Sequence, residues 1–256
     1  MQRLKPLGLA VLIALLLTGI IWLLIGDSAV SRAMARQGEG AAAQNPPVPS
    51  TPNDFILPGT QPESLIHRIT DPSECTNCHA NYYTAPDQPP ETRTWQAWQG
   101  SMMAQAGRDP LFYAALDVAN AGAANAGEFC LRCHMPRGWL EGRSTTPDGS
   151  DMTKEDLEGV QCEVCHRMVD PLTTPNNPAR DTQILADLTF PVATIGSGQK
   201  IVDPEDFRRG PFDIAADLGF DPHEVSAGAQ TLVSPYHQES DLCGTCHDIN
   251  NPMFAW

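Results

Sequence analysis

The chain has 256 residues and a mass of 27.7 kDa, which allows one or two domains. Its 16 Lys and Arg stand against 31 Asp and Glu, so the formal net charge is −15. A surface this acidic argues against nucleic acid as a partner and favours proteins with basic docking surfaces. The same acidity would also serve simply to keep an exported protein soluble.

The first 26 residues predict a membrane anchor. Arg3 and Lys5 precede an uncharged stretch over residues 7–26, and about 20 apolar residues suffice to cross a hydrocarbon layer as a helix. A cleaved signal peptide usually has a shorter apolar stretch, although Ala33-Met34-Ala35 offers a cleavage site. We favour a retained transmembrane helix in the cytoplasmic membrane over residues 1–26, with its basic end in the cytoplasm. Anchored or cleaved, the remainder lies on the exported, periplasmic or extracellular side.

Residues 27–63 predict a tether. They are rich in Ala, Gln, Pro, Ser and Gly, including Asn45-Pro46-Pro47-Val48-Pro49. No hydrophobic period survives there, so we expect semi-extended backbone that holds residues 64–256 clear of the bilayer. Mere slack in the chain would have the same composition.

Four copies of one signature, Cys-x-x-Cys-His, organise residues 64–256. They use all 8 cysteines of the chain: Cys75, Cys78, Cys130, Cys133, Cys162, Cys165, Cys243 and Cys246. A histidine directly follows each second cysteine: His79, His134, His166 and His247. In this signature the thiols bond to haem and the histidine is the first axial ligand of its iron. Cysteines three apart lie on one face of a helix, so a single turn can hold a macrocycle.

Two other uses of the cysteines compete with haem. A zinc site would use pairs of Cys-x-x-Cys but gives no reason for a histidine after every second cysteine. A disulfide framework explains an even count, but not the repeated spacing. The sequence therefore predicts four covalently bound haem c groups.

Two helices are expected between the first and second signatures. Residues 91–105 predict a helix with Trp95, Trp98 and Met102 on one face. Asp109-Pro110 predicts an N-cap followed by proline at the first helical position, and this second helix runs to about residue 120.

Shorter elements are expected further along. Residues 152–158 predict a short helix that ends at Gly159, just before the third signature. Short strands are expected near 184–192 and 231–234. The signatures begin at 75, 130, 162 and 243, without a fixed period, so the chain is not a solenoid. We predict a mainly α-helical fold with much irregular loop, in which the haems form the core.

The second axial ligands come from the residues left over. Seven histidines minus four in the signatures leave His67, His223 and His237, and four six-coordinate irons need four such ligands. Met102 and Met103 are the candidates for the fourth, although core packing at helical spacing competes with that role. A His/Met iron would have a higher potential than His/His irons.

Four stretches resemble a known family: Trp98-x-x-Ser101-x-Met103, Phe129-Cys130 to Pro136, Gly159-Val160-Gln161-Cys162 to His166, and Ser234-Pro235-Tyr236-His237 to His247-Asp248. They are similar to exported multihaem cytochromes related to cytochrome c-554 and hydroxylamine oxidoreductase, over roughly residues 67–252. The resemblance implies stacked haem pairs, helical wrapping and electron transfer. Relatives commonly have histidine where this chain has Met103. Many are longer, so the stop at Trp256 fits either a truncated C-terminus or a partner chain that completes the domain.

Three functions follow from these observations. The leading one is a membrane-anchored tetrahaem carrier that passes electrons from a quinol-side donor to an exported acceptor, without catalysis of its own. The second is an oxidoreductase of small nitrogen or sulfur compounds, which needs one open iron and acid–base groups. The third is a subunit of a larger haem complex or filament.

Overall fold

A computed structural model describes residues 46–80, 94–227 and 230–250. The chain divides into two units, Met1–Pro46 and Pro47–Trp256. The predicted membrane helix and the first part of the tether lie outside the described residues. Within them, no helix is both long enough and apolar enough to span a membrane.

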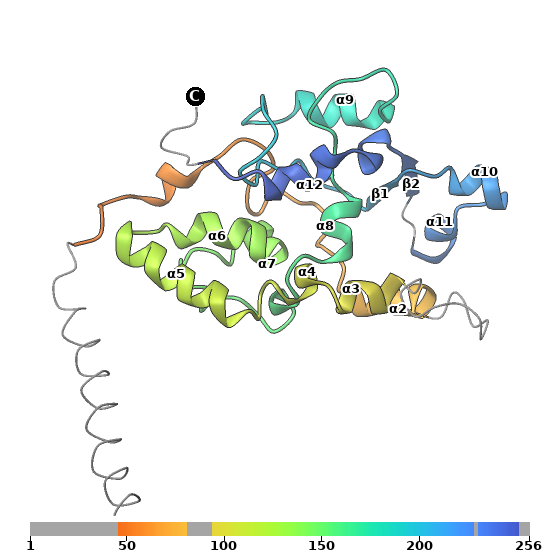
Figure 1. The fold of residues 1–256 in the computed structure, drawn as a ribbon. Coiled ribbons are helices and arrows are strands. Elements are labelled where there is room, and N and C mark those ends of the chain that lie inside the picture. The colour runs from red at the N-terminus through yellow and green to blue at the C-terminus, as the bar shows by residue number, and fades with distance from the viewer. Residues whose placement is uncertain (1–45, 81–93, 228–229, 251–256) are drawn as a thin grey trace, which may run out of the picture. The chain divides into compact units, whose positions relative to one another are not determined.

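The described part is mainly helical, with long loops, as predicted (Figure 1). The helices are α2 (Pro72–His79), α3 (Thr94–Gln99), α4 (Met102–Gln105), α5 (Pro110–Gly122), α6 (Gly127–His134), α7 (Pro136–Leu140), α8 (Cys162–His166), α9 (Ala179–Ala186), α10 (Ile214–Leu218), α11 (Pro222–Ala227) and α12 (Ser240–His247). Two short strands, β1 (Phe207–Gly210) and β2 (Gln230–Val233), pair in parallel. Helices α10 and α11 form the crossover that a parallel pair requires.

The continuous helix predicted over residues 91–105 is wrong in its second half. The backbone leaves the helix at Gly100-Ser101 and re-enters it as α4. The Ser101 hydroxyl accepts a hydrogen bond from the Ala104 N–H, which makes serine the N-cap of α4. The start of the predicted helix lies outside the described residues. Trp98 and Met102 therefore sit on different helices.

The second predicted helix is confirmed as α5. The Asp109 carboxylate accepts a hydrogen bond from the Leu111 N–H at 2.9 Å, and proline occupies the first turn. The short helix predicted over residues 152–158 is only a 3₁₀ turn at Asp156–Glu158. Gly159 ends that turn with a φ of +67°, and an added Cβ would meet the Met103 carbonyl oxygen at 2.3 Å.

Of the two predicted strands, one is confirmed and one is wrong. Strand β2 occupies the expected place. The other segment overlaps α9, whose residues Ala179–Ala186 include several good helix formers. A four-residue strand with two arginines, β1, was not predicted, because Arg208 and Arg209 show no alternation of apolar and polar residues.

The domain boundary lies earlier than predicted. The backbone N–H of Val48 donates to the Gly122 carbonyl oxygen at 2.9 Å. The Thr60 N–H donates to the Lys200 carbonyl oxygen at 2.9 Å, and the Glu63 N–H donates to the Leu140 carbonyl oxygen at 2.7 Å. Residues 47–63 are therefore part of the domain, because its loops satisfy their backbone groups. Composition alone does not reveal such pairing.

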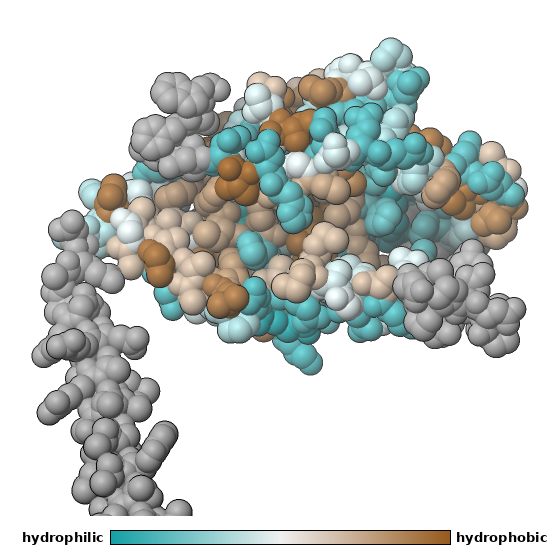
Figure 2. Space-filling view, in the orientation of Figure 1, coloured by the Kyte–Doolittle hydropathy of each residue, from teal (hydrophilic) through white to brown (hydrophobic). Residues whose placement is uncertain are grey.

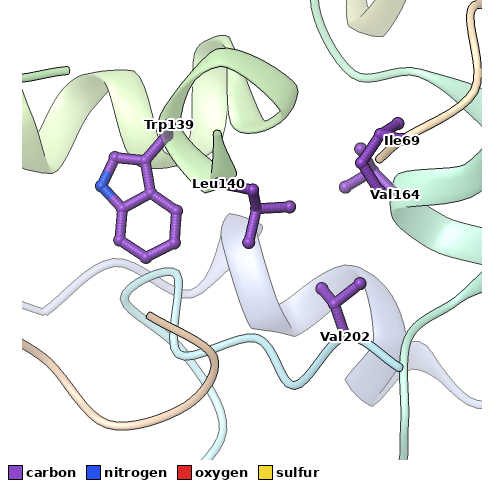
Figure 3. Close-up of a cluster of buried hydrophobic side chains, with 5 residues drawn as sticks. All are labelled: Ile69, Trp139, Leu140, Val164 and Val202. Carbon is purple, nitrogen blue, oxygen red and sulfur yellow. The ribbon is translucent and has the colours of Figure 1, made fainter. Parts of the chain in front are cut away.

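Two small clusters of buried side chains make up the apolar core. One contains Ile69, Trp139, Leu140, Val164 and Val202 (Figure 3). The other contains Phe112, Leu116, Leu131 and Met135. Val164 lies inside the third signature and Leu131 inside the second, so the core fixes the helices that carry them.

Candidate haem-binding site

Each of the four signatures forms the last turn of a helix that ends at its histidine. This holds for α2, α6, α8 and α12. The helical turn brings both thiols and the imidazole to one face, as the spacing predicts. All eight cysteines are free thiols. Among the described residues, no group of three or more His, Cys, Asp and Glu side chains is placed to hold a metal ion.

The thiols of different signatures meet in two pairs. The Cys162 thiol lies beside the Cys75 thiol and lowers the pKa of Cys75. Cys246 does the same to Cys133 and lowers its pKa to about 6. The first signature thus lies beside the third, and the second beside the fourth.

Two spare histidines lie opposite two signature histidines. The ring centres of His79 and His223 are 6.1 Å apart, with planes at 14°. Those of His166 and His237 are 6.0 Å apart, with planes at 19°. An imidazole nitrogen lies about 1.1 Å from its ring centre and binds a metal ion at about 2.0 Å, so two imidazoles sharing one ion have centres roughly 6 Å apart. Both pairs fit a shared iron.

A hydrogen bond on one ring nitrogen orients each of three of these rings. Nδ1 of His166 lies 2.9 Å from the Arg209 carbonyl oxygen, and Nδ1 of His223 lies 2.9 Å from the Thr231 hydroxyl. In His237, Nε2 lies 3.0 Å from the Cys165 carbonyl oxygen, while Nδ1 is buried without a hydrogen-bond partner. Ligating histidines usually donate one N–H to such an oxygen and keep the other nitrogen for the metal.

Burial keeps four histidine side chains of this site neutral. It lowers the pKa of His79, His134 and His223, and it lowers the pKa of His237 to about 4. Neutral imidazole is the form that binds iron, so at pH 7 these side chains are in the ligating state.

His67, the third spare histidine, occupies a different environment. Its side chain is exposed, and its Nδ1 accepts a hydrogen bond from the Asp206 N–H at 3.2 Å. That bond places the proton of the neutral ring on Nε2. Within the described residues, His67 makes no ring contact with a signature histidine.

The two candidate methionines lie on α4, with Met102 73% and Met103 45% exposed. The Met103 carbonyl accepts the Val160 N–H at 2.9 Å, which ties α4 to the lead-in of the third signature. No contact in the described part joins either sulfur to His134 or His247. Phe112 instead stacks on His134, with ring centres 4.1 Å apart and planes at 13°.

Charged side chains that the sequence did not predict at this site surround both thiol pairs. Beside Cys75, the Glu163 carboxylate accepts from the Thr70 N–H at 2.9 Å and pairs with Arg208 and with Arg167. Arg208 also pairs with Asp206 at 3.2 Å. Glu74 is a third anion that acts on Cys75, so charges of both signs meet there.

The second thiol pair faces two buried cations. The Lys200 ammonium donates to the Arg132 carbonyl at 2.5 Å, and both side chains lie over the Trp139 ring, at 4.6 and 4.4 Å from its centre. The Trp139 indole N–H donates to Glu128, whose pKa burial raises. Burial also lowers the pKa of Lys200 to about 8. No periodicity marks these charges as buried, although Arg132 lies inside a signature.

A helical turn that presents two thiols and an imidazole on one face is the arrangement by which c-type cytochromes hold haem. Residues 74–167 match the protein family described as Cytochrome c554 and c-prime, which supports a place among c-type cytochromes, covalent haem c and a role in electron transfer. No curated protein and no solved structure matches the chain.

Proposed function

We propose that this chain is an exported tetrahaem cytochrome, anchored by its N-terminal helix, that carries electrons from a membrane donor to an exported acceptor. The observation that supports it best is the 6.1 and 6.0 Å spacing of the two opposed histidine pairs. An iron with an imidazole on both sides has no open position for substrate.

Each part of the chain has a role in this proposal. The eight cysteines hold four haem c groups, and His79, His134, His166 and His247 are the first ligands. His223, which lies opposite His79, and His237, which lies opposite His166, would supply second ligands. The groups supply one-electron chemistry when bound. Carbonyl and hydroxyl oxygens orient His166, His223 and His237. Burial keeps His79, His223 and His237 neutral.

The paired thiols favour an arrangement of two haem pairs. Thioether bonds from Cys75 and Cys162 would start side by side, as would those from Cys133 and Cys246. Haem edges in contact allow fast electron exchange within a pair. The first and third signatures would hold one such pair, and the second and fourth would hold the other.

An oxidoreductase with one open iron is the second candidate. The observation that favours it is that, within the described residues, His134 and His247 face none of the spare histidines. If Met102 or Met103 does not ligate, one or both of these irons are open to a small nitrogen or sulfur compound.

Low-temperature electron paramagnetic resonance of the oxidised holoprotein tests both readings. We expect four haems per chain by mass, with at least two His/His low-spin signals. A mass equal to the bare polypeptide would overturn the proposal. Rapid binding of carbon monoxide or cyanide at one haem of the untreated protein would favour the oxidoreductase.

A further inference from the structure

The residues around α10 form an exposed apolar surface. Phe212 is 64% exposed, Leu218 52% and Phe220 54%, and α10 buries none of its residues. Gly219 adopts the left-handed conformation, with a φ of +79°, and ends the helix just before Phe220. Figure 2 shows hydrophobic residues gathered in this part of the molecule. We call Phe212, Leu218 and Phe220 the α10 patch.

A helix of five residues gains little from its own hydrogen bonds and normally forms because packing holds it. Here Ile214 is half-buried, but Leu218 and the flanking Phe212 and Phe220 are exposed. Exposed aromatic residues grouped in this way mark contact surfaces in soluble proteins.

The rim of the α10 patch is acidic. Asp213, Asp217 and Glu224 are exposed around it. The sequence after Arg209 has no Lys or Arg and has seven acidic residues: Asp213, Asp217, Asp221, Glu224, Glu239, Asp241 and Asp248. An apolar centre with a negative rim complements a partner that has an apolar centre and a positive rim.

The α10 patch is joined directly to a candidate iron ligand. Asp221 follows Phe220, and its carboxylate accepts from the His223 N–H at 2.9 Å and from the Thr231 N–H at 2.6 Å. Thr231 in turn holds the His223 ring through its hydroxyl. One short, hydrogen-bonded piece therefore connects the α10 patch to the imidazole opposite His79.

We propose that the α10 patch docks a redox protein with a basic rim and that electrons cross there by way of the His79–His223 site. This rests on the proposed function. One electron leaves the reduced cytochrome, which is oxidised by one equivalent, and the ferric iron of the partner becomes ferrous without a proton. Contacts of this kind are small and transient. The negative rim disfavours an anionic bilayer and a second copy of this chain, because like charges would meet.

The test measures electron transfer by stopped flow from the reduced holoprotein to ferric mitochondrial cytochrome c, a basic single-haem protein. The apolar variant is Phe212→Ser/Phe220→Ser, matched by Leu111→Ser on α5. The charge variant is Asp217→Asn/Glu224→Gln, matched by Asp117→Asn on α5. A small inorganic oxidant serves as a second acceptor that needs no docking surface.

We expect the apolar variant to slow reduction of cytochrome c about tenfold, because loss of central apolar anchors typically costs that much. The charge variant should slow it a few-fold at low salt and flatten the dependence on ionic strength. Leu111→Ser, Asp117→Asn and the inorganic oxidant should show wild-type rates.

Wild-type rates in both α10 variants of a haem-loaded protein would overturn this inference and leave the proposed function intact. So would an equal slowing by the α5 controls. A wild-type dimer in sedimentation that the apolar variant dissociates would make the α10 patch a self-contact and also overturn it. A purified chain without haem would instead remove the proposed function.

Discussion

The two thiol pairs lie in contrasting surroundings. Beside Cys75 and Cys162, carboxylates that include Glu163 lie among the cations Arg167 and Arg208, and two opposed histidine pairs lie close by. Beside Cys133 and Cys246, Arg132 and Lys200 outnumber Glu128. The first region has opposed imidazoles and charges of both signs, whereas the second is cationic. A positive surrounding favours the electron-rich, reduced state of a metal group, so the second region should have the higher reduction potentials.

The largest effect is expected from removing an opposed histidine. His223→Ala and His237→Ala should each convert one haem from low spin to high spin, because each iron loses its second imidazole. His67→Ala should leave the spectrum unchanged and is the matched control. Electron paramagnetic resonance and carbon monoxide binding measure the change. An equal loss of low-spin signal in His67→Ala would refute the pairing.

Glu163→Gln should destabilise the fold by removing a buried carboxylate from the first region. The carboxylate is 1% exposed, and its removal leaves Arg167 and Arg208 without their shared partner. Breaking a buried ion pair typically costs roughly 3–5 kcal/mol, so we expect a fall of this size in the free energy of unfolding by denaturant titration. Glu155→Gln, at an exposed position, should change it by less than about 0.5 kcal/mol. Equal effects at both positions would contradict a role for burial.

The contrast between these regions also shows what the sequence does and does not predict. Cys-x-x-Cys-His dictates its own helical turn, so the four signatures were predictable in position and in local structure. The opposition of His223 to His79 depends on contacts across 144 residues and leaves no local pattern. Likewise, Lys200 looks like any surface lysine until the fold places it over Trp139.

Raising the pH above 7 should stabilise the folded protein, because of Lys200 in the second region. Lys200 has a folded-state pKa of about 8 because burial disfavours its charge, against 10.5 for an exposed lysine. Between these values the unfolded chain holds a proton that the native chain has released, so stability rises with pH, by up to roughly 3 kcal/mol. Nearby thiolate charge raises this pKa, and thioether bonds would remove that charge, so the window in the holoprotein begins at or below pH 8. Unfolding titrations from pH 7 to 10.5 should show the rise, and Lys200→Met should lack it.

The smallest change is expected in the reduction potentials of the second region. Lys200→Met removes one buried cation beside Cys133 and Cys246 while keeping an unbranched side chain over Trp139. For charges about 10 Å apart at an effective dielectric constant of about 20, the loss is roughly 1.5 kcal/mol, or about 65 mV for one electron. Spectroelectrochemical titration should show the two highest potentials falling while the two lowest stay in place. Lys154→Met, at an exposed position, should shift neither pair measurably, since solvent screens its charge. A uniform fall of all four potentials in Lys200→Met would show that the cation acts on the whole protein, and the difference between the two regions would then lie in ligation alone.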